Sequence, residues 1–251
     1  PLIEKILKAE PDYAEAYATR ALIKLREKDP SGAIKDVETT VSLKPHLTQM
    51  WQLLSSLHYQ ANNLSGAIEA LRSALKNESK NANIMAQLGE FLRQNNEAGE
   101  AINILEVATK LAPEDAKAWA NLGVALQQEK RKADAKIAYE KALALDPESA
   151  AVSSNLGAIA GEAEDWESAL QYFERALEIQ PNLAEAHSNL GGVLKELGRL
   201  HEALSSYNQA KALKPDSAET HNDLGNVLHE LGRLGEAEAS YERAIALKPD
   251  F

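Results

Sequence analysis

The sequence predicts an all-α fold in which antiparallel helix pairs stack into a solenoid, and three regularities support this prediction. Prolines recur at a spacing of 34 residues or a multiple of it, and a serine occupies the single missing place. The other two regularities are an alanine and a small residue, each at a fixed place in the same period. Such repetition at a fixed period is the signature of a repeat architecture. The prolines and the serine are Pro11, Pro45, Ser79, Pro113, Pro147, Pro181, Pro215 and Pro249.

Division at this period gives seven units after an initial segment, residues 1–13. The units are 14–47, 48–81, 82–115, 116–149, 150–183, 184–217 and 218–251. The eighth residue is small in every unit, the twentieth is always Ala, and the twenty-fourth is large and apolar. In the sixth unit these residues are Gly191, Ala203 and Tyr207. Small residues allow two helices to approach closely, and the large residue fills the space beside them.

Each unit contains the pattern of two helices. In the sixth unit, Leu190, Gly191 and Leu194 lie on one face of a first helix, and "LGR" at 197–199 ends it. Apolar residues from Leu200 to Ala210 form the face of a second helix, which ends before "KPD". Residues 1–13 have the pattern of a second helix without its first. No segment shows the alternation of a strand. One helix pair cannot bury its apolar face alone, so successive pairs must stack.

The array resembles the tetratricopeptide repeats, whose pattern is W-x2-L-G-x2-Y…A-x3-F…P. The fourth unit shows it as Trp119, Leu122, Gly123, Ala135, Tyr139 and Pro147, with Leu126 at the place of the first Tyr. The resemblance covers the whole chain and implies a right-handed α-solenoid. The first two units depart from the pattern, with Arg20, Thr40, Ser55 and Ser79 at its apolar, small or Pro positions.

Both ends of the array look unfinished, because residues 1–13 lack a first helix and no polar capping helix follows residue 251. We therefore expect the chain to be a segment of a longer array or protein. An alternative expectation is end-to-end self-association through the uncapped terminal repeats.

Composition excludes several classes of function. The formal net charge of −11 would repel nucleic acid and anionic membrane surfaces, and no apolar run is long enough for a membrane span. No cysteine is present, so disulfides and thiolate chemistry are excluded. We expect no cofactor and a cytoplasmic location.

The sequence also lacks the motifs of catalytic and metal sites, and a non-enzymatic protein is predicted. His187 and His221 are 34 residues apart, at the fourth position, where other units have Trp51 or Trp119. A metal site would need a third ligand at suitable spacing, and none is present. We interpret both histidines as filling the tryptophan packing position.

In tetratricopeptide arrays the first helices line a concave surface where partners usually bind. The sixth position of the units on that surface carries a series of carboxamides, which can both donate and accept hydrogen bonds along a peptide backbone. The series is Gln87, Asn121, Asn155 and Asn189, and Asp223 follows it in the last unit. Nearby positions change from basic to Gln-rich to acidic: Arg26 and Arg93, then Gln127, then Glu162, Glu196, His229 and Glu230.

Two subtypes of the family can be compared with these positions. The carboxylate clamp that binds chaperone tails needs Lys at the fifth position, and no unit has one. The last two units are similar to the repeat region of O-GlcNAc transferases, which implies an asparagine ladder that holds substrate polypeptide.

The main hypothesis is a non-catalytic scaffold that binds an extended peptide or protein segment in the concave groove. The alternatives are the substrate-recruiting arm of a larger glycosyltransferase-like enzyme and a self-assembling scaffold.

Overall fold

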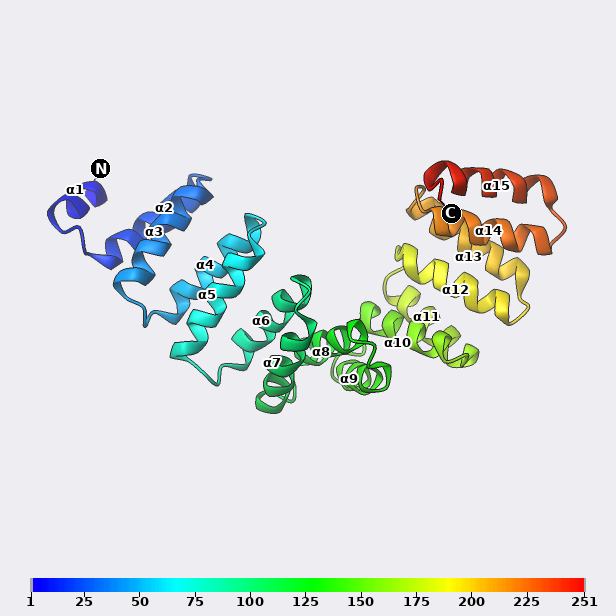
Figure 1. The fold of residues 1–251 in the computed structure, drawn as a ribbon, viewed down its shortest axis with the longest axis horizontal. Helices are drawn as coiled ribbons and strands as arrows, with labels where there is room; N and C mark the ends of the chain where they lie inside the picture. The colour runs from blue at the N-terminus through cyan, green and yellow to red at the C-terminus, as the bar shows by residue number, and fades with distance from the viewer. Residues whose placement is uncertain (1, 251) are drawn as a thin grey trace. The chain divides into compact units, whose positions relative to one another are not determined.

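A computed structural model describes residues 2–250 of the chain, and Figure 1 shows their helices. These residues form fifteen α-helices and no strand. The chain divides into two compact units, Pro1–Ala135 and Lys136–Phe251, and the boundary falls within α9. From here on, 'unit' means one of these two parts, and each 34-residue segment is called a repeat. The helices are α1 (Leu2–Ala9), α2 (Ala14–Arg26), α3 (Pro30–Leu43), α4 (Thr48–Gln60), α5 (Leu64–Asn77), α6 (Ala82–Gln94), α7 (Ala98–Leu111), α8 (Ala116–Gln128), α9 (Lys132–Leu145), α10 (Ala150–Glu162), α11 (Trp166–Ile179), α12 (Ala184–Glu196), α13 (Leu200–Leu213), α14 (Ala218–Glu230) and α15 (Leu234–Leu247).

The all-α prediction is confirmed, and the order of contacts is that of a stack of helix pairs. In the first unit α2 packs on α3, α4 on α5 and α6 on α7, and each second helix also contacts the next first helix. In the second unit the pairs are α10 with α11, α12 with α13, and α14 with α15. First helices also contact one another directly, α6 with α8, α10 with α12 and α12 with α14. The first helices of each unit therefore share one face.

Tight turns join the two helices of each pair, and each turn contains one residue in the left-handed region. These residues are Lys28, Asn62, Asn96, Lys130, Glu164, Gly198 and Gly232, with φ between 57° and 75°. After Gly198, the Arg199 N–H donates to the carbonyl of Leu194 at 2.8 Å, which satisfies a carbonyl at the end of α12. The predicted break of the first helix at "LGR" is thus a helix C-cap.

Where the eighth residue of a repeat is glycine, as at Gly191 and Gly225, it lies directly against the large residue at the twenty-fourth position of the same repeat. A Cβ placed on Gly191 would lie 2.9 Å from the ring of Tyr207, and one on Gly225 would lie 2.6 Å from the ring of Tyr241. Such distances are shorter than normal carbon contacts, so only glycine permits this approach. The prediction that small and large residues interlock is therefore confirmed.

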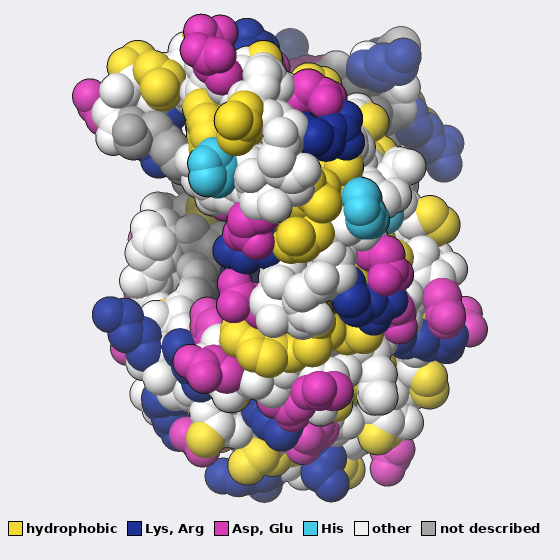
Figure 2. Space-filling model, turned by 90° about the vertical axis from the view of Figure 1, so that its right-hand side faces the viewer, with side chains coloured by type: hydrophobic (Ala, Val, Ile, Leu, Met, Phe, Trp, Pro, Cys, Tyr) yellow, Lys and Arg dark blue, Asp and Glu magenta, His cyan; other side chains and the backbone are white. Residues whose placement is uncertain are grey.

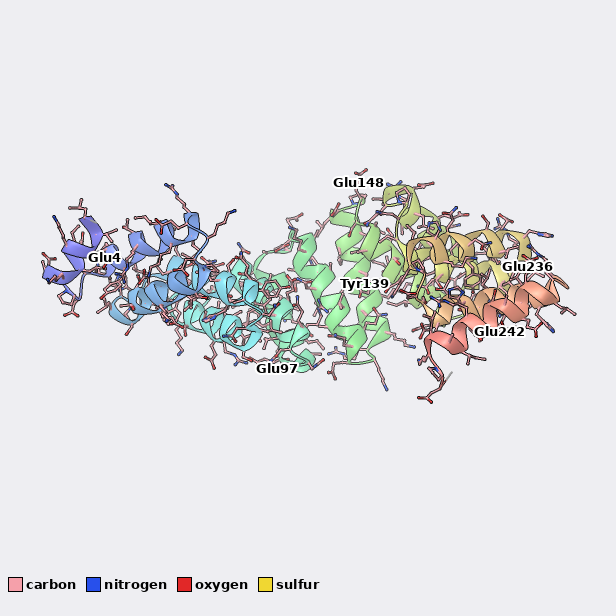
Figure 3. All side chains as sticks on the ribbon, turned by 90° about the horizontal axis from the view of Figure 1, so that it is seen from above. Glu4, Glu97, Tyr139, Glu148, Glu236 and Glu242 are labelled. Carbon is pink, nitrogen blue, oxygen red and sulfur yellow. The ribbon has the colours of Figure 1, made fainter. Side chains whose placement is uncertain are left out.

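The rings of the twenty-fourth position belong to the core. Tyr139 of α9 is fully buried, and Figure 3 shows it among the helices. Glu236 and Glu242 lie on the last helix, α15, in the same view. Large residues in the core and carboxylates on the helix exteriors follow the amphipathic pattern of the sequence.

The aromatic ring at the fourth position of a repeat is fixed by one recurring hydrogen bond, to the carbonyl of the proline six residues before it. The indole Nε1 of Trp51 donates to the carbonyl of Pro45 at 2.8 Å, and Trp119 donates to Pro113 at 2.9 Å. The Nε2 atoms of His187 and His221 lie 2.9 Å and 3.0 Å from the carbonyls of Pro181 and Pro215. A carbonyl only accepts, so each Nε2 carries a proton. The interpretation of both histidines as substitutes for tryptophan is confirmed.

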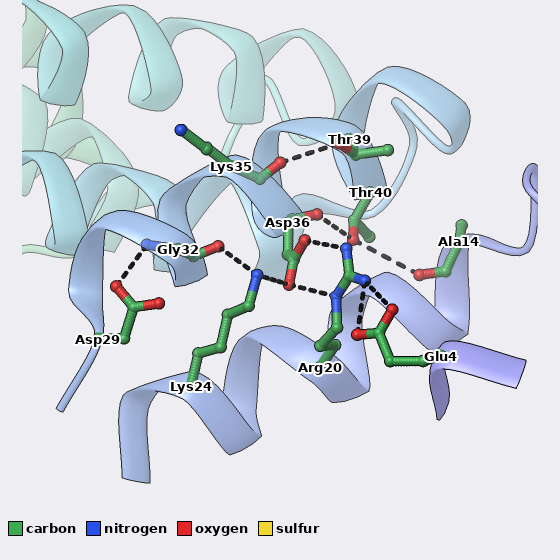
Figure 4. Close-up of polar contacts among 10 residues, drawn as sticks. All are labelled: Glu4, Ala14, Arg20, Lys24, Asp29, Gly32, Lys35, Asp36, Thr39 and Thr40. Atoms are coloured by element: carbon green, nitrogen blue, oxygen red, sulfur yellow. Dashed lines mark hydrogen bonds and ion pairs between the residues drawn. The ribbon is translucent and has the colours of Figure 1, made fainter. Parts of the chain in front are cut away.

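The first helix pair replaces part of this apolar packing with a polar network, shown in Figure 4. Asp36 of α3 is 3% exposed. It accepts hydrogen bonds from Arg20 at 2.7 Å and 2.9 Å and lies 2.8 Å from the ammonium of Lys24. Arg20 also pairs with Glu4 of α1 at 2.9 Å. The hydroxyl of buried Thr40 donates to the backbone carbonyl of Asp36 at 2.8 Å. The departures at Arg20 and Thr40 thus have internal partners.

The network determines the titration of Asp36. Burial by itself raises the pKa of this carboxyl, but the hydrogen bonds from Arg20 and Lys24 lower it by more, so the net pKa lies below that of an ordinary Asp. Both cations stand at positions where the fourth repeat has leucine, Leu122 and Leu126. Asp36 therefore neutralises two cations, Arg20 and Lys24, at positions that are apolar in the fourth repeat.

We predict that Gly225→Ala destabilises the protein by about 1–3 kcal/mol, because the added methyl group collides with Tyr241. Gly235→Ala is the matched control, since no atom lies within 4 Å of the new Cβ. This change should stabilise α15 by roughly 0.5–1 kcal/mol, because Ala is the better helix former. Urea unfolding monitored by circular dichroism measures both. Equal effects of the two changes would contradict the role assigned to Gly225.

We predict that Asp36→Asn costs about 2–3 kcal/mol at neutral pH, because it leaves Arg20 and Lys24 without their anion. The folded pKa of Asp36 lies below its unfolded value, so its stabilisation is present above about pH 4 and is lost as pH falls through the folded pKa. The difference in Tm between wild type and variant should shrink correspondingly. A difference that stays constant from pH 7 to strong acid would refute this account.

We further predict that the triple change Arg20→Leu, Lys24→Leu and Asp36→Ala is neutral or stabilising, unlike Asp36→Asn alone. It copies the apolar residues of the fourth repeat, and replacing a whole buried ionic group often gains about 1–4 kcal/mol. Calorimetry of the triple variant measures the change. A loss of stability equal to that of Asp36→Asn would show that the ionic network itself stabilises the pair.

Candidate functional site

The predicted carboxamide series lies on the first helices of successive pairs. Gln87 on α6 and Asn121 on α8 belong to the first unit, and Asn155 on α10 and Asn189 on α12 belong to the second. Gln87, Asn121 and Asn155 are partly buried and Asn189 is exposed. Among residues 2–250, none of the four side chains has a hydrogen-bond partner. Their hydrogen-bonding groups are therefore not used within the described part of the chain.

A pocket of about 460 Å³ lies on the first-helix face of the second unit, and we call it the Tyr207 pocket. It brings together four residues that the sequence singled out: Glu162, Asn189, Glu196 and Asp223. Helices α10 to α14 all contribute to it. Its full lining is Gly157, Ala158, Gly161, Glu162, Trp166, Phe173, Ser188, Asn189, Gly192, Val193, Lys195, Glu196, Tyr207 and Asp223.

A second pocket of about 350 Å³ adjoins the first at Ser188 and Asn189, which line both. It extends over the start of α12 and α14, with Glu185, Glu219 and Thr220 in its lining. We call the two pockets together the groove. Asn189 lies at their junction, where a chain running along the groove would pass it.

Sequence reasoning missed the aromatic part of the Tyr207 pocket. The twenty-fourth position, which is Phe173 in the fifth repeat and Tyr207 in the sixth, is predicted from the sequence only to pack between helices. The signal that could have revealed them is the ninth position of the repeat, which is Ala158 in the fifth repeat and Gly192 in the sixth. Small residues there leave the rings uncovered. The hydroxyl of Tyr207 lies 3.5 Å from where a Cβ on Gly192 would be.

The carboxylates of the pocket stand close enough to influence one another and the phenol. Burial raises the pKa of Asp223, against weaker lowering by Asn222 and Lys195. Burial also raises the pKa of Tyr207, and the charges of Asp223 and Glu196 add to the rise. Lys195 lies 3.2 Å from Glu196. The Tyr207 hydroxyl is therefore protonated, and the local field is negative.

The other predicted site residues lie outside this pocket. Arg26 on α2 is exposed at the end of its helix, and His229 and Glu230 are exposed in the last turn of α14. Gln127 on α8 is partly buried. Arg93 on α6 is partly buried too, and within the described residues its Nε has no hydrogen-bond partner. Arg26, Arg93 and Gln127 belong to the first unit and are described apart from the groove.

Charged side chains of both signs are interspersed over the face seen in Figure 2, with short strips of hydrophobic side chains between them. In residues 2–250 no group of His, Asp and Glu side chains is arranged to hold a metal ion. Over the same residues, no helix has the length and apolar character required to cross a membrane.

Comparison with solved structures places the chain among tetratricopeptide repeat proteins. YrrB, described as a TPR protein with an unusual peptide-binding site, has a TM-score of 0.63 and 27% identity, over 73% of this chain and 95% of that one. PilF of Pseudomonas aeruginosa has a TM-score of 0.70 and 24% identity, over 82% of this chain and 94% of that one. No curated protein sequence matches the chain.

The family comparison covers almost the whole sequence, from residue 8 to residue 251. It agrees with the stacked helix pairs described above. The fold and the family together make the protein a tetratricopeptide repeat scaffold for protein interaction. The chain belongs to the tetratricopeptide repeat family of the cilia and flagella-associated protein 70 C-terminal domain.

Proposed function

We propose that the chain is a non-catalytic scaffold that holds an extended peptide segment of a partner protein in its groove. The backbone of the peptide is held by the carboxamides of the sixth position in the second unit. These are Asn189, which lines both pockets, and Asn155, which has the same position in the preceding repeat and lines neither pocket. The observation that carries the proposal is that these side chains have no partner within residues 2–250, while Asn189 lines both pockets of the groove.

The energetics of the helices support this role. Asn is less favourable than Ala inside a helix by roughly half a kcal/mol, because its amide competes for backbone groups. Asn155 and Asn189 have no side-chain hydrogen bond in the described residues that offsets this cost. An amide has one acceptor and two donor hydrogens, so it can bond to both polar groups of a peptide unit whatever the side chains are. Repeated weak contacts of this kind add along the chain.

Charge gives the groove a preference among peptides. Glu162, Glu196 and Asp223 line the Tyr207 pocket, and Glu185 and Glu219 line the adjoining pocket. Exposed Glu230 adds to this acidic set on α14. In the first unit Arg26 and Arg93 supply positive charge on α2 and α6. The groove of the second unit therefore favours basic segments, because opposite charges accelerate encounter and fix register.

The similarity to YrrB supports the same conclusion. That protein is described as having a peptide-binding site, and 27% of the aligned residues are identical to those of this chain. The surface proposed here lies on the same type of repeat, and it is identified by residues of this sequence alone.

We predict that the double variant Asn155→Ala, Asn189→Ala binds peptide roughly 10–100-fold more weakly, because two to four hydrogen bonds of about 0.5–1.5 kcal/mol each are lost. The ligand is a peptide selected on wild type from a random displayed library. Isothermal titration calorimetry gives Kd. The Tm should stay unchanged or rise slightly, since Ala favours helix.

The matched control is Gln171→Ala with Gln209→Ala, which removes two exposed carboxamides from the second helices α11 and α13. This variant should bind as wild type does. A second arm uses peptides N-methylated at single backbone positions. Backbone recognition requires some of these to bind much more weakly than peptides with a side chain cut to Ala. Unchanged affinity of the asparagine variant, or a large fall in its Tm, would refute the proposal.

A further inference from the structure

The phenol of Tyr207 is buried, and its hydroxyl lacks a partner. The residue is 3% exposed and lines the Tyr207 pocket. Within residues 2–250 the hydroxyl makes no hydrogen bond. The oxygen is not among the buried side-chain atoms that lack a partner, so it is open to the pocket. A donor group of a ligand can therefore reach it.

The next repeat shows how the same hydroxyl is satisfied elsewhere. Tyr241 occupies the position of Tyr207 one repeat later, and its hydroxyl donates to Oδ1 of Asn226 at 2.9 Å. Asn226 stands at the ninth position, where the sixth repeat has Gly192. The glycine therefore removes an internal partner and opens the hydroxyl to the pocket.

The walls of the pocket define the charge of what can enter. Three carboxylates line it, from Glu162, Glu196 and Asp223, against the single ammonium of Lys195. That ammonium is already paired with Glu196. Asp223 is partly buried, and burial disfavours its charged form. A cation in the pocket would stabilise the carboxylate at this position.

The floor of the pocket is apolar and aromatic. Trp166, Phe173 and Val193 line it beside Tyr207. Long cationic side chains bury an aliphatic stem on such a surface while the charged head reaches polar groups. A guanidinium also stacks favourably on aromatic rings.

We infer that the Tyr207 pocket binds one arginine side chain of the peptide held in the groove. This inference rests on the proposed function and adds a specificity to it. The planar guanidinium has five N–H donors in a fixed fork, so it can donate to the Tyr207 oxygen and to the Asp223 carboxylate together. A lysine ammonium is a more compact and more strongly hydrated charge, which makes lysine the weaker occupant.

Two variants test the pocket without altering the asparagines. Gly192→Asn reproduces the ninth position of the next repeat, where the tyrosine hydroxyl donates to the asparagine Oδ1, and it places a side chain in the pocket beside that hydroxyl. A Cβ at Gly192 lies at an ordinary contact distance from the Tyr207 hydroxyl, so the helix accommodates it. Asp223→Asn keeps the shape and removes the charge. Glu242→Gln on exposed α15 is the matched control for charge loss.

The probes are labelled peptides of one Ala- and Ser-rich sequence with a single central Arg, Lys, citrulline or Glu. Binding to isotope-labelled protein is measured by NMR titration, with the amide signals of Gly192 and Asp223 as local reporters. On wild type, the Arg peptide should bind roughly tenfold more tightly than the citrulline peptide, because a charge-assisted hydrogen bond is stronger than a neutral one. Lys should be intermediate and Glu weakest.

Gly192→Asn and Asp223→Asn should each abolish most of the difference between Arg and citrulline, while Glu242→Gln retains it. All peptides should still bind weakly to the two pocket variants, because the asparagines remain. Equal binding of Arg and citrulline to wild type would overturn the arginine pocket and leave the proposed function standing. An Arg preference that survives in both pocket variants would also overturn it. Failure of every peptide to bind wild type would overturn both proposals.

Discussion

The close contact between a small residue of one helix and a ring of its partner determines how each pair is built. Where a glycine occupies the eighth position, the backbone of the first helix lies against the residue at the twenty-fourth position, as in Gly191 with Tyr207 and Gly225 with Tyr241. The ring then lies directly against the first helix. Phe173 and Tyr207, which fill the core in this way, also line the Tyr207 pocket, so the groove of the second unit depends on the same contact.

Sequence periodicity predicted the helices well, because each rule behind it is local and recurs. Proline after the second helix, alanine at the twentieth position and a small eighth residue all act within one pair. The hydrogen bonds from His187 and His221 follow from the same register. Repetition supplies seven observations of one geometry, so a single exception such as Ser79 does not obscure it.

Sequence reasoning missed two features. One is an ion pair formed with a residue whose position follows no repeat pattern, and the other is a pocket that exists because a side chain is missing. Arg20 was recognised as an exception, but its partner Asp36 lies at a position where other repeats have several residue types, so no pattern marked it. The Tyr207 pocket was half predicted: its acidic residues and Asn189 were identified, and its aromatic floor was not. A glycine that uncovers a neighbour leaves no positive signal in the sequence, because its effect is on a side chain fifteen residues away on another helix.

Two neighbouring repeats differ in how their tyrosine is bonded. Tyr241 donates a hydrogen bond to Asn226, whereas Tyr207 has Gly192 at the same place. Under the proposed arginine pocket, a helix pair whose tyrosine is bonded internally would act as a spacer, and one with glycine at the ninth position would receive a single side chain. A change of one codon in a repeat would then alter what that repeat recognises, while the packing of the pair is preserved. A solenoid of this kind would then change its ligand specificity one repeat at a time.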